Sequence, residues 1–220
     1  DLVVIDNELG RGAFGRVLLG TALGIEETGK RTKVAVKTLK EGADSRARME
    51  LLEELELMNK VGSHPNVVRL LGYCKEKDPV YVIFEFLSKG DLKNVLMECR
   101  ETDTGTGYSN IPGPSRSLSR TLVKFASDVA NGMAFLSAQK CVHRDLAARN
   151  VLVGDDMECK VSDFGLARDV MNIRIYQRQS EGPLPIRWMA LESLLDDVYT
   201  TESDVWSFGI LLWEIVTLGE

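Results

Sequence analysis

The sequence HRDLAARN at residues 143–150, followed by DFG at residues 163–165, decides the fold of this chain. Between the two motifs, Val151–Val153 is apolar, residues 154–156 have the Gly-Asp-Asp composition of a turn, and Cys159–Ser162 again suits a strand. Two strands joined by so short a connection pair antiparallel. The pattern therefore predicts a hairpin that brings the end of the first motif beside the start of the second.

Three polar side chains are expected at the open end of this hairpin. Asn150 precedes the first strand and Asp163 follows the second, so an amide oxygen and a carboxylate converge there. Mg²⁺ is a hard ion that prefers oxygen ligands of this kind. Asp145 lies at the same end and is placed to orient a hydroxyl nucleophile. The alternative interpretation is a polar surface hairpin without chemistry.

The two motifs resemble the catalytic and metal-binding loops of protein kinases. The sequence AAR at residues 147–149 is similar to receptor-type tyrosine kinases, because a serine/threonine kinase usually has a lysine where this chain has the first alanine. The resemblance implies that Asp163 binds a Mg²⁺ bridging the phosphates of ATP and that Asn150 binds a second Mg²⁺. It also implies that Asp145 accepts the proton of a tyrosine hydroxyl or orients that hydroxyl, with Arg149 supporting the acceptor side.

The composition is that of an ordinary globular chain. Of its 220 residues, 44% are hydrophobic and 27% charged, with a formal net charge of -6 and a pI near 5.2. This acidic balance argues against a nucleic-acid-binding surface, which is normally basic. Four cysteines without metal-ligand spacing indicate free thiols, and no apolar run is long enough to span a membrane. The start does not resemble a signal peptide, and the end, just past an apolar stretch, indicates a C-terminally truncated domain.

The expected fold class is α+β, the two-lobed protein kinase fold. Residues 1–84 are interpreted as an N-lobe, an antiparallel β-sheet with one helix over residues 44–60. Residues 85–90 are the expected hinge, and residues 91–220 a partial, mostly helical C-lobe.

Three segments of the expected C-lobe have distinct patterns. Polar residues at about 100–117, rich in Gly, Ser, Thr and Pro, predict a mobile loop that matches a kinase insert. Residues 163–192 correspond to the activation segment. The run Val205–Val216 is apolar on nearly every face, which predicts a helix buried all round.

A glycine-rich loop near the start of the chain contains Gly10, Gly12, Phe14, Gly15 and Val17. Glycine lets backbone N–H groups approach phosphate oxygens closely. A Rossmann site would need a helix after the loop, and a Walker A loop would need a Gly-Lys-Ser/Thr sequence. Because apolar residues continue the pattern of a strand here, the loop is predicted to be a hairpin tip of the kinase type, with a plain hairpin turn as the alternative.

Lys37 ends an apolar strand, where its charge needs an anionic partner. Glu54 lies on the apolar stripe of the helix over residues 44–60, where a carboxylate is costly unless it is paired. The two are therefore predicted to form an ion pair that aims Lys37 at phosphate oxygens. Glu53 is the alternative partner, but it falls on the polar side of the helix.

The resemblance further implies an adenine pocket, although its side chains are equally good core residues. Besides the glycine loop and Lys37, the expected ATP-contacting residues are Leu9, Val17, Ala35, Phe84, Glu85, Leu87, Asp91 and Leu152. Phe84 takes the gatekeeper position and Asp91 is expected at the ribose. The backbone of Glu85 and Leu87 is expected to bind the adenine edge.

Three residues, two in the motifs and one in the apolar stretch near the end of the chain, are interpreted as structural. His143 and Phe164 are expected to pack rather than to act chemically. Asp204 begins the apolar helix, and the matching residue of kinases anchors the backbone of the catalytic loop, so Asp204 is expected to do the same.

Tyr176 is the one tyrosine of the expected activation segment and is flanked by arginines. A phosphate there adds about -1.5 to -2 charges and recruits guanidinium groups, and Arg144 beside Asp145 is the expected partner. Tyr176 is therefore predicted to be the activating autophosphorylation site. Pro185–Ala190 resembles the tyrosine-substrate platform of receptor kinases.

Nearly the whole chain is similar to the kinase domain of fibroblast growth factor receptors, with vascular endothelial growth factor receptors next. The resemblance is carried by Thr32–Lys37, Asn66–Gly72, Gln139–His143 and Asp204–Gly219. In that family an Asn, a hinge Glu and a Lys before the metal loop form an autoinhibitory brake. Asn66, Glu85 and Lys160 match those positions, although such polar residues can equally be solvated.

The function expected from this resemblance is a receptor-type protein tyrosine kinase catalytic domain, with ATP and Mg²⁺ as substrate and cofactor. A single-pass plasma-membrane receptor with this domain in the cytoplasm, a homodimer phosphorylating in trans, and phosphotyrosine-binding adaptors follow from the family. The alternatives are a pseudokinase, a serine/threonine kinase, and a docking scaffold with Tyr108 as its bait site.

Overall fold

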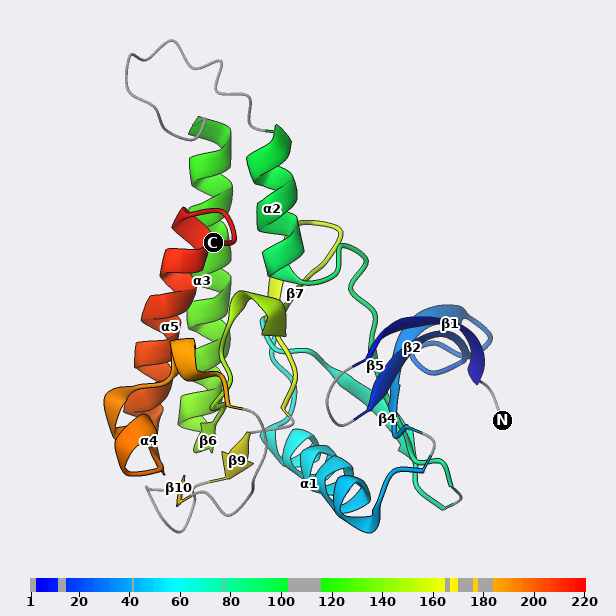
Figure 1. Ribbon diagram of the computed structural model, residues 1–220. Coiled ribbons are helices and arrows are strands. Elements are labelled where there is room, and N and C mark those ends of the chain that lie inside the picture. The colour runs from blue at the N-terminus through cyan, green and yellow to red at the C-terminus, as the bar shows by residue number, and fades with distance from the viewer. Residues whose placement is uncertain are drawn as a thin grey trace. The chain divides into compact units, whose positions relative to one another are not determined.

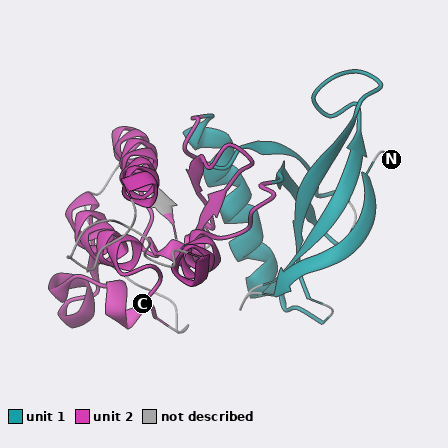
Figure 2. Ribbon diagram, turned by 90° about the horizontal axis from the view of Figure 1, so that it is seen from above, with its two compact units in different colours: residues 1–63, 68–86 teal, residues 64–67, 87–220 magenta. Residues whose placement is uncertain are grey.

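The computed structural model describes residues 3–11, 15–40, 42–76, 78–102, 116–164, 167–169, 176–177 and 184–220 (Figure 1). The chain divides into two compact units, which Figure 2 distinguishes by colour. Unit 1 comprises Asp1–Ser63 and Val68–Phe86, and unit 2 comprises His64–Val67 and Leu87–Glu220. The crossing from Phe86 to Leu87 falls within residues 85–90, the stretch expected as a hinge. No sequence pattern indicated that residues 64–67 belong to unit 2 while the residues on both sides of them belong to unit 1.

Unit 1 is built on a five-stranded antiparallel sheet with the strand order β1-β2-β3-β5-β4. Its strands are β1 (Val3–Arg11), β2 (Arg16–Leu23), β3 (Arg31–Thr38), β4 (Leu70–Cys74) and β5 (Tyr81–Glu85). β2 and β3 pair over their whole length, from Arg16 opposite Thr38 to Leu23 opposite Arg31. The antiparallel sheet expected within residues 1–84 is thus confirmed.

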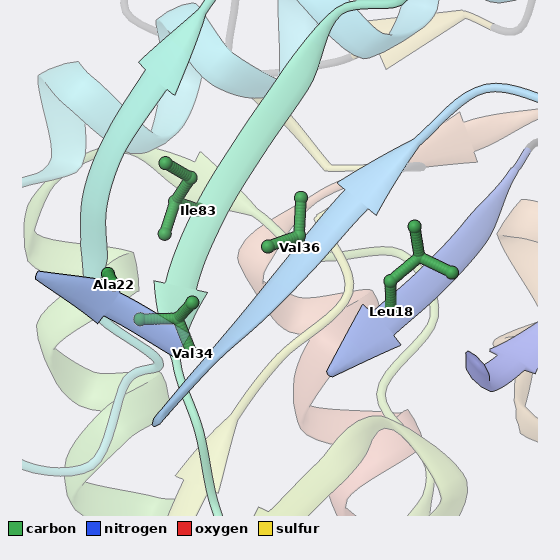
Figure 3. Packing of buried hydrophobic residues seen from close by; sticks show 5 residues of the cluster. All are labelled: Leu18, Ala22, Val34, Val36 and Ile83. Carbon is green, nitrogen blue, oxygen red and sulfur yellow. The ribbon is translucent and has the colours of Figure 1, made fainter. Parts of the chain in front are cut away.

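Alternation along these strands gives the sheet two different faces. Val34 and Val36 of β3 are fully buried and pack with Leu18, Ala22 and Ile83 (Figure 3). The residues between them, Ala35 and Lys37, must project to the opposite face because side chains alternate along a strand. The core cluster therefore covers one face of the sheet, and Ala35 and Lys37 belong to the opposite face.

Helix α1 (Ser45–Val61) of unit 1 begins and ends where its capping residues predict. The Asp44 carboxylate accepts a hydrogen bond from the backbone N–H of Ala47 at 2.8 Å, which satisfies one unpaired donor of the first turn. Gly62 follows at a φ of 84°, a backbone conformation that favours glycine, and its N–H donates to Met58 O. The helix predicted over residues 44–60 is confirmed.

Unit 2 is mostly helical, with short strand pairs between the helices. Its elements are α2 (Leu92–Thr102), α3 (Arg116–Ala138), β6 (Cys141–Val142), η1 (Ala148–Asn150), β7 (Val151–Val153), β8 (Cys159–Val161), β9 (Arg168–Asp169), β10 (Tyr176–Gln177), η2 (Ile186–Trp188), α4 (Leu191–Leu195), β11 (Val198–Tyr199) and α5 (Thr201–Val216). The predicted loop at 100–117 was too wide at both ends, because α2 continues to Thr102 and α3 begins at Arg116. Tyr108 lies outside the described residues.

β7 and β8 form the predicted antiparallel hairpin, with Val151 opposite Val161 and Val153 opposite Cys159. Backbone hydrogen bonds continue the ladder on both sides. Val153 exchanges bonds with the segment at residues 89–90, and Val161 N donates to Asn66 O at 2.9 Å. The hairpin therefore forms backbone hydrogen bonds with two segments that are distant from it in sequence.

The expected all-round burial of the apolar helix was wrong for the described chain. In α5, Val205, Trp206, Trp213 and Val216 are each more than half exposed. The buried positions of α5 include Ser203, Asp204, Ser207 and Glu214 as well as Leu211 and Ile215. The orientation of α5 follows its polar residues, because these accept or donate hydrogen bonds that apolar side chains cannot supply.

The cysteines are free thiols, as predicted, with Cys141 and Cys159 buried. Across the described helices, none has both the length and the apolar character that a membrane span requires.

Candidate active site

The first part of the candidate site lies in unit 1 and consists of a partly buried ion pair. Lys37 Nζ lies 2.7 Å from Glu54 Oε1 and 2.6 Å from Oε2. The two side chains are only 17% and 6% exposed, respectively. The predicted contact is confirmed, and Glu53 is exposed as the helical pattern indicated. The pair ties the end of β3 to α1 and holds the ammonium group in place.

The glycine-rich loop connects β1 to β2, as its hairpin interpretation requires. Gly10 pairs with Val17 across the two strands. A Cβ atom on Gly15 would lie 2.5 Å from the carbonyl oxygen of Thr38, so only glycine allows β2 to begin this close to β3. Gly12 and Phe14 lie outside the described residues.

Four of the residues expected at ATP share one face of the unit 1 sheet. Val17 is directly opposite Lys37, and Ala35 is directly opposite Phe84. Directly opposed residues project to the same face of a sheet, as do residues two apart along one strand. Val17, Ala35, Lys37 and Phe84 therefore line the face opposite the apolar cluster of Figure 3.

Two other expected residues of unit 1 have different surroundings. Leu9 lies in β1 and is 47% exposed. Glu85 ends β5, and its carboxylate accepts a hydrogen bond from the backbone N–H of Arg69 at 2.7 Å. This bond fixes the first residue of the expected hinge to the segment before β4.

In unit 2, Asp91 and Leu152 are brought together by an antiparallel bridge, and Leu87 is buried. Both carboxylate oxygens of Asp91 accept hydrogen bonds from Asn94, one from its backbone N–H at 2.9 Å and one from its side-chain amide at 2.7 Å. Asp91 therefore caps the start of α2, a role that the sequence interpretation did not include.

The catalytic-loop residues of unit 2 form a connected polar cluster. The Asp145 carboxylate is paired with the guanidinium of Arg149. Asn150 Nδ2 donates to Asp145 O at 2.7 Å, and Ser162 N donates to Asn150 O at 2.9 Å. These bonds orient the Asn150 amide and place Asp163, the next residue after Ser162, at the same end of the hairpin.

Burial and neighbouring charged groups both affect the pKa of Asp145. Burial raises the pKa of its carboxyl above the ordinary value, and the nearby Asp163 carboxylate raises it further. The guanidinium of Arg149, with smaller effects from His143 and Asn150, opposes this rise in the pKa. Arg149 is thus the main group that lowers the pKa of Asp145 against the effect of burial.

The oxygen atoms at this end of the hairpin fit Mg²⁺. The exposed Asp163 carboxylate and the Asn150 amide oxygen are hard ligands. Across the described part of the chain, no group of three or more His, Cys, Asp and Glu side chains could hold a metal. A pair of protein ligands completed by water and phosphate oxygens is nevertheless the usual protein share of a Mg²⁺ site.

Asp204 anchors the catalytic loop, as expected. Its two carboxylate oxygens accept hydrogen bonds from the backbone N–H groups of His143, at 2.7 Å, and Arg144, at 2.9 Å. Burial raises the pKa of the Asp204 carboxyl. Arg144 has a φ of 70°, a strained conformation for a residue with a side chain, and the two bonds help to hold it there.

His143 and Phe164 have the packing roles predicted for them. His143 is fully buried, its Nε2 lies 3.0 Å from Ser162 O, and its ring lies 5.4 Å from the ring of Phe164. The imidazole therefore connects the two motifs instead of facing a substrate.

The residues expected to regulate the site are only partly described. The guanidinium of Arg144 stacks over the ring of Tyr199, 4.1 Å from its centroid. The backbone of Tyr176 pairs with Tyr199 in the β10–β11 ladder, while the Tyr176 side chain lies outside the described residues. Arg144 and the Tyr176 backbone are thus both neighbours of Tyr199.

Of the three residues expected to form a brake, Asn66 belongs to unit 2. Its side-chain amide donates to Cys159 O at 3.0 Å, directly before Lys160 in β8. Glu85 belongs to unit 1. The brake therefore stays a prediction.

Sequence reasoning missed Glu214 and its contact with Trp188. Glu214 is 3% exposed, and one of its oxygens, Oε2, accepts from Ala148 N at 2.9 Å and from Trp188 Nε1 at 3.0 Å. The signal was available, because Glu214 is the one charged residue in the run from Val205 to Val216. A carboxylate in an apolar helix needs partners.

Comparison with known proteins shows the family. The family model described as protein tyrosine and serine/threonine kinase matches residues 3–220. The chain therefore belongs to the protein tyrosine and serine/threonine kinase family and is a protein kinase domain, with the expected antiparallel sheet and helical part.

Individual relatives are similar over the whole chain. The tyrosine kinase receptor Cad96Ca of Drosophila melanogaster is 52% identical over 214 residues, which cover 97% of this chain and 27% of that protein. Fibroblast growth factor receptor 1 of Pleurodeles waltl is 47% identical over 222 residues, covering 100% of this chain and 27% of the receptor. The fibroblast growth factor receptor of Strongylocentrotus purpuratus is 46% identical, with 22% of its length covered. The chain thus spans about a quarter of the length of these relatives.

Proposed function

We propose that this chain is the catalytic domain of a receptor-type protein tyrosine kinase, which transfers the γ-phosphate of ATP to tyrosine hydroxyls of proteins. The observation that carries the proposal is the cluster of Asp145, Arg149 and Asn150 at the end of the β7–β8 hairpin, with Asp163 beside it. The similarity to proteins named as tyrosine kinase and fibroblast growth factor receptors supports the choice of tyrosine.

In this proposal unit 1 is the N-lobe and unit 2 the C-lobe of the kinase. Residues 85–90 form the hinge, about 100–117 the insert and 163–192 the activation segment. The proposed ATP-contacting residues are Leu9, Gly10, Gly12, Phe14, Gly15, Val17, Ala35, Lys37, Phe84, Glu85, Leu87, Asp91 and Leu152. The face shared by Val17, Ala35, Lys37 and Phe84 supports this assignment within unit 1.

Phosphoryl transfer depends mainly on positioning and on stabilising the charge that develops on the phosphate. Lys37 supplies a positive charge for the α- and β-phosphates, and Glu54 keeps its ammonium in place through two short contacts. Mg²⁺, when bound to Asp163 and Asn150, neutralises phosphate charge.

Asp145 orients the acceptor hydroxyl and takes its proton onto a carboxylate oxygen. Arg149 has two functions in this scheme, because its guanidinium keeps Asp145 ionised and also stacks over the ring of Trp188, 4.3 Å from the centroid. The alanine at position 147 leaves the acceptor side without the lysine usual in serine/threonine kinases, which is consistent with a tyrosine acceptor.

Regulation is proposed to act through phosphorylation of Tyr176. The pairing of the Tyr176 backbone with Tyr199, on whose ring Arg144 stacks, supports Arg144 as the partner of the phosphate. Trans-autophosphorylation in a homodimer, binding of phosphotyrosine adaptors and a place on the cytoplasmic side of the plasma membrane belong to the same proposal. The Asn66, Glu85 and Lys160 brake is proposed as a restraint on this activation.

The test is phosphosite mapping by mass spectrometry after incubation with Mg-ATP and paired acceptor peptides that differ only in tyrosine or serine. We expect phosphate on the tyrosine peptide and on Tyr176, no phosphate on the serine peptide, and neither product with Asp145→Asn. A Tyr176→Phe variant should transfer phosphate more slowly. Nucleotide binding, measured by a thermal shift, without transfer by the unchanged chain would overturn the proposal in favour of a pseudokinase.

A further inference from the structure

The residues that hold the catalytic loop lie along one face of α5. Asp204 accepts the backbone N–H groups of His143 and Arg144, and Ser207 donates to Trp188 O at 2.7 Å. Glu214 is seven positions beyond Ser207 and therefore on the same face of the helix. The helix thus contacts the start of the catalytic loop, the substrate platform and, through Glu214, the end of the loop.

Glu214 joins two parts of unit 2 through a single atom. Its Oε2 accepts from the backbone N–H of Ala148, the first residue of η1, and from the indole N–H of Trp188 in η2. Because Glu214 is 3% exposed and Ala148 is fully buried, water cannot replace the carboxylate as acceptor for the Ala148 N–H. A carboxylate makes both bonds charge-assisted and so stronger than neutral ones.

The contact continues from Trp188 to the reacting groups. The Trp188 ring supports the guanidinium of Arg149 at 4.3 Å, and Arg149 pairs with the Asp145 carboxylate. The hydrogen bond to Glu214 fixes the orientation of the Trp188 indole ring. The guanidinium of Arg149 stacks on that ring, so its position depends on the same hydrogen bond. The position of Arg149 in turn determines where the Asp145 carboxylate is held.

We propose that Glu214 is a positioning residue of the phosphoryl-transfer site, which couples the platform residue Trp188 to Arg149 and Asp145. The inference rests on the proposed function for its catalytic consequence. Glu214 touches neither substrate nor metal in this scheme and acts through the groups that it orients. If Trp188 is displaced, by substitution or by a change in the platform, Arg149 and the Asp145 carboxylate that it pairs with are displaced as well.

Three variants of the whole 220-residue chain separate positioning from simple packing. Glu214→Gln keeps a carbonyl oxygen that can accept both N–H groups, whereas Glu214→Met fills a similar volume without an acceptor. Trp188→Phe keeps a ring for Arg149 and removes the indole donor. Glu202→Gln, an exposed change on the same helix, is the matched control for loss of one negative charge from α5.

With Glu214→Met we expect kcat for the tyrosine peptide to fall roughly 10- to 100-fold, while KM for ATP changes less than about twofold, because the displaced groups act on the acceptor. Glu214→Gln should restore most of the rate, and Glu202→Gln should behave as the unchanged chain. Glu214→Met and Trp188→Phe should be non-additive when combined, because they remove the same contact.

The inference is overturned if Glu214→Met only lowers the melting temperature and keeps the rate per folded molecule unchanged. It is also overturned if Glu214→Gln is as impaired as Glu214→Met. A second measurement does not depend on catalysis, so it tests the Glu214–Trp188 contact even if the proposed function is wrong. The indole N–H resonance of Trp188, assigned with Trp188→Phe, should be protected from solvent exchange and lose that protection in Glu214→Met whether or not the chain transfers phosphate.

Discussion

The contact between Lys37 and Glu54 could be predicted from local sequence patterns. Strand alternation placed Lys37 away from the apolar cluster, and helical periodicity placed Glu54 on the buried stripe of α1. Neither charge is tolerated there without the other. The pair is consequently a structural element of unit 1 as well as a proposed part of the ATP site.

We expect Lys37→Met to lower the free energy of unfolding by roughly 3 kcal/mol, because it removes the ammonium group that faces the buried Glu54 carboxylate. The double variant Lys37→Met, Glu54→Leu should recover most of that loss, since an apolar pair can replace a buried ion pair without penalty. Both variants should lack phosphoryl transfer. Urea unfolding followed by circular dichroism gives the stabilities. Equal destabilisation by the single and double variants would contradict this account.

The Asp145–Arg149 pair determines the expected pH dependence. Asp145 must be ionised to take the proton of the acceptor hydroxyl, and burial raises its pKa, so kcat should fall as pH decreases through that raised value. Arg149→Gln removes the main group that lowers the pKa of Asp145, so the acid limb should move to higher pH. Arg120→Gln, on the exposed surface of α3, is the control and should leave the profile unchanged. An acid limb that stays in place in Arg149→Gln would exclude Asp145 as its origin.

At the scale of elements, the β7–β8 hairpin depends on close packing against its neighbours. A Cβ atom on Gly132 of α3 would lie 2.4 Å from Asn66 O and 3.1 Å from a methyl group of Val161. Asp128 of the same helix accepts from Cys159 N at 3.0 Å and from Lys124 Nζ at 2.8 Å. The absence of a side chain at residue 132 therefore allows α3 to reach the hairpin that carries the proposed metal ligands.

Two alanine substitutions of helical glycines should have opposite effects on stability. Gly132→Ala should destabilise the chain by about 1–3 kcal/mol through overpacking, although alanine favours helices. Gly209→Ala in α5 meets nothing within 4 Å and should stabilise it, by about 0.5–1 kcal/mol. Urea unfolding of the two variants in parallel measures both, and stabilisation by Gly132→Ala as well as by Gly209→Ala would show that helix propensity, not contact with Asn66, decides at Gly132.

At the scale of the whole molecule, each of the two units holds its own part of the proposed machinery by internal contacts. The ion pair of Lys37 lies entirely within unit 1, and the cluster around Asp145 lies entirely within unit 2. The stability of each unit can therefore be probed separately.

The cysteines supply such a probe. Cys74 of unit 1 is exposed, whereas Cys159 of unit 2 is buried, and burial raises the pKa of the Cys159 thiol to about 12. At pH 8 we expect iodoacetamide to label Cys74 rapidly and Cys159 only when unit 2 opens, because the thiolate is the reacting species. Peptide mapping over a series of urea concentrations measures both sites. Rapid labelling of Cys159 in the native chain would contradict the burial of β8.

Local features of this chain could be predicted from the sequence. The β7–β8 hairpin, the start and end of α1 and the Lys37–Glu54 contact follow from alternation, capping residues and the need of a buried charge for a partner. In the first two cases the interacting residues are close in sequence. In the third, the two periodic patterns left few candidate partners.

Only the tertiary structure decided the contacts between distant segments. Glu214 is 66 residues from Ala148, and Asn66 is 93 residues from Cys159. A periodic pattern shows that a polar side chain is on a buried face, but it does not show which backbone group will meet it there. The exposed apolar side of α5 has the same origin, because the helix turns its hydrogen-bonding residues toward the catalytic loop and leaves Val205 and Trp213 outside. The sequence by itself determined which residues are suited to phosphoryl transfer, and the packing of distant segments decided how they are held, because hydrogen bonds between such segments form only where the fold brings donor and acceptor together.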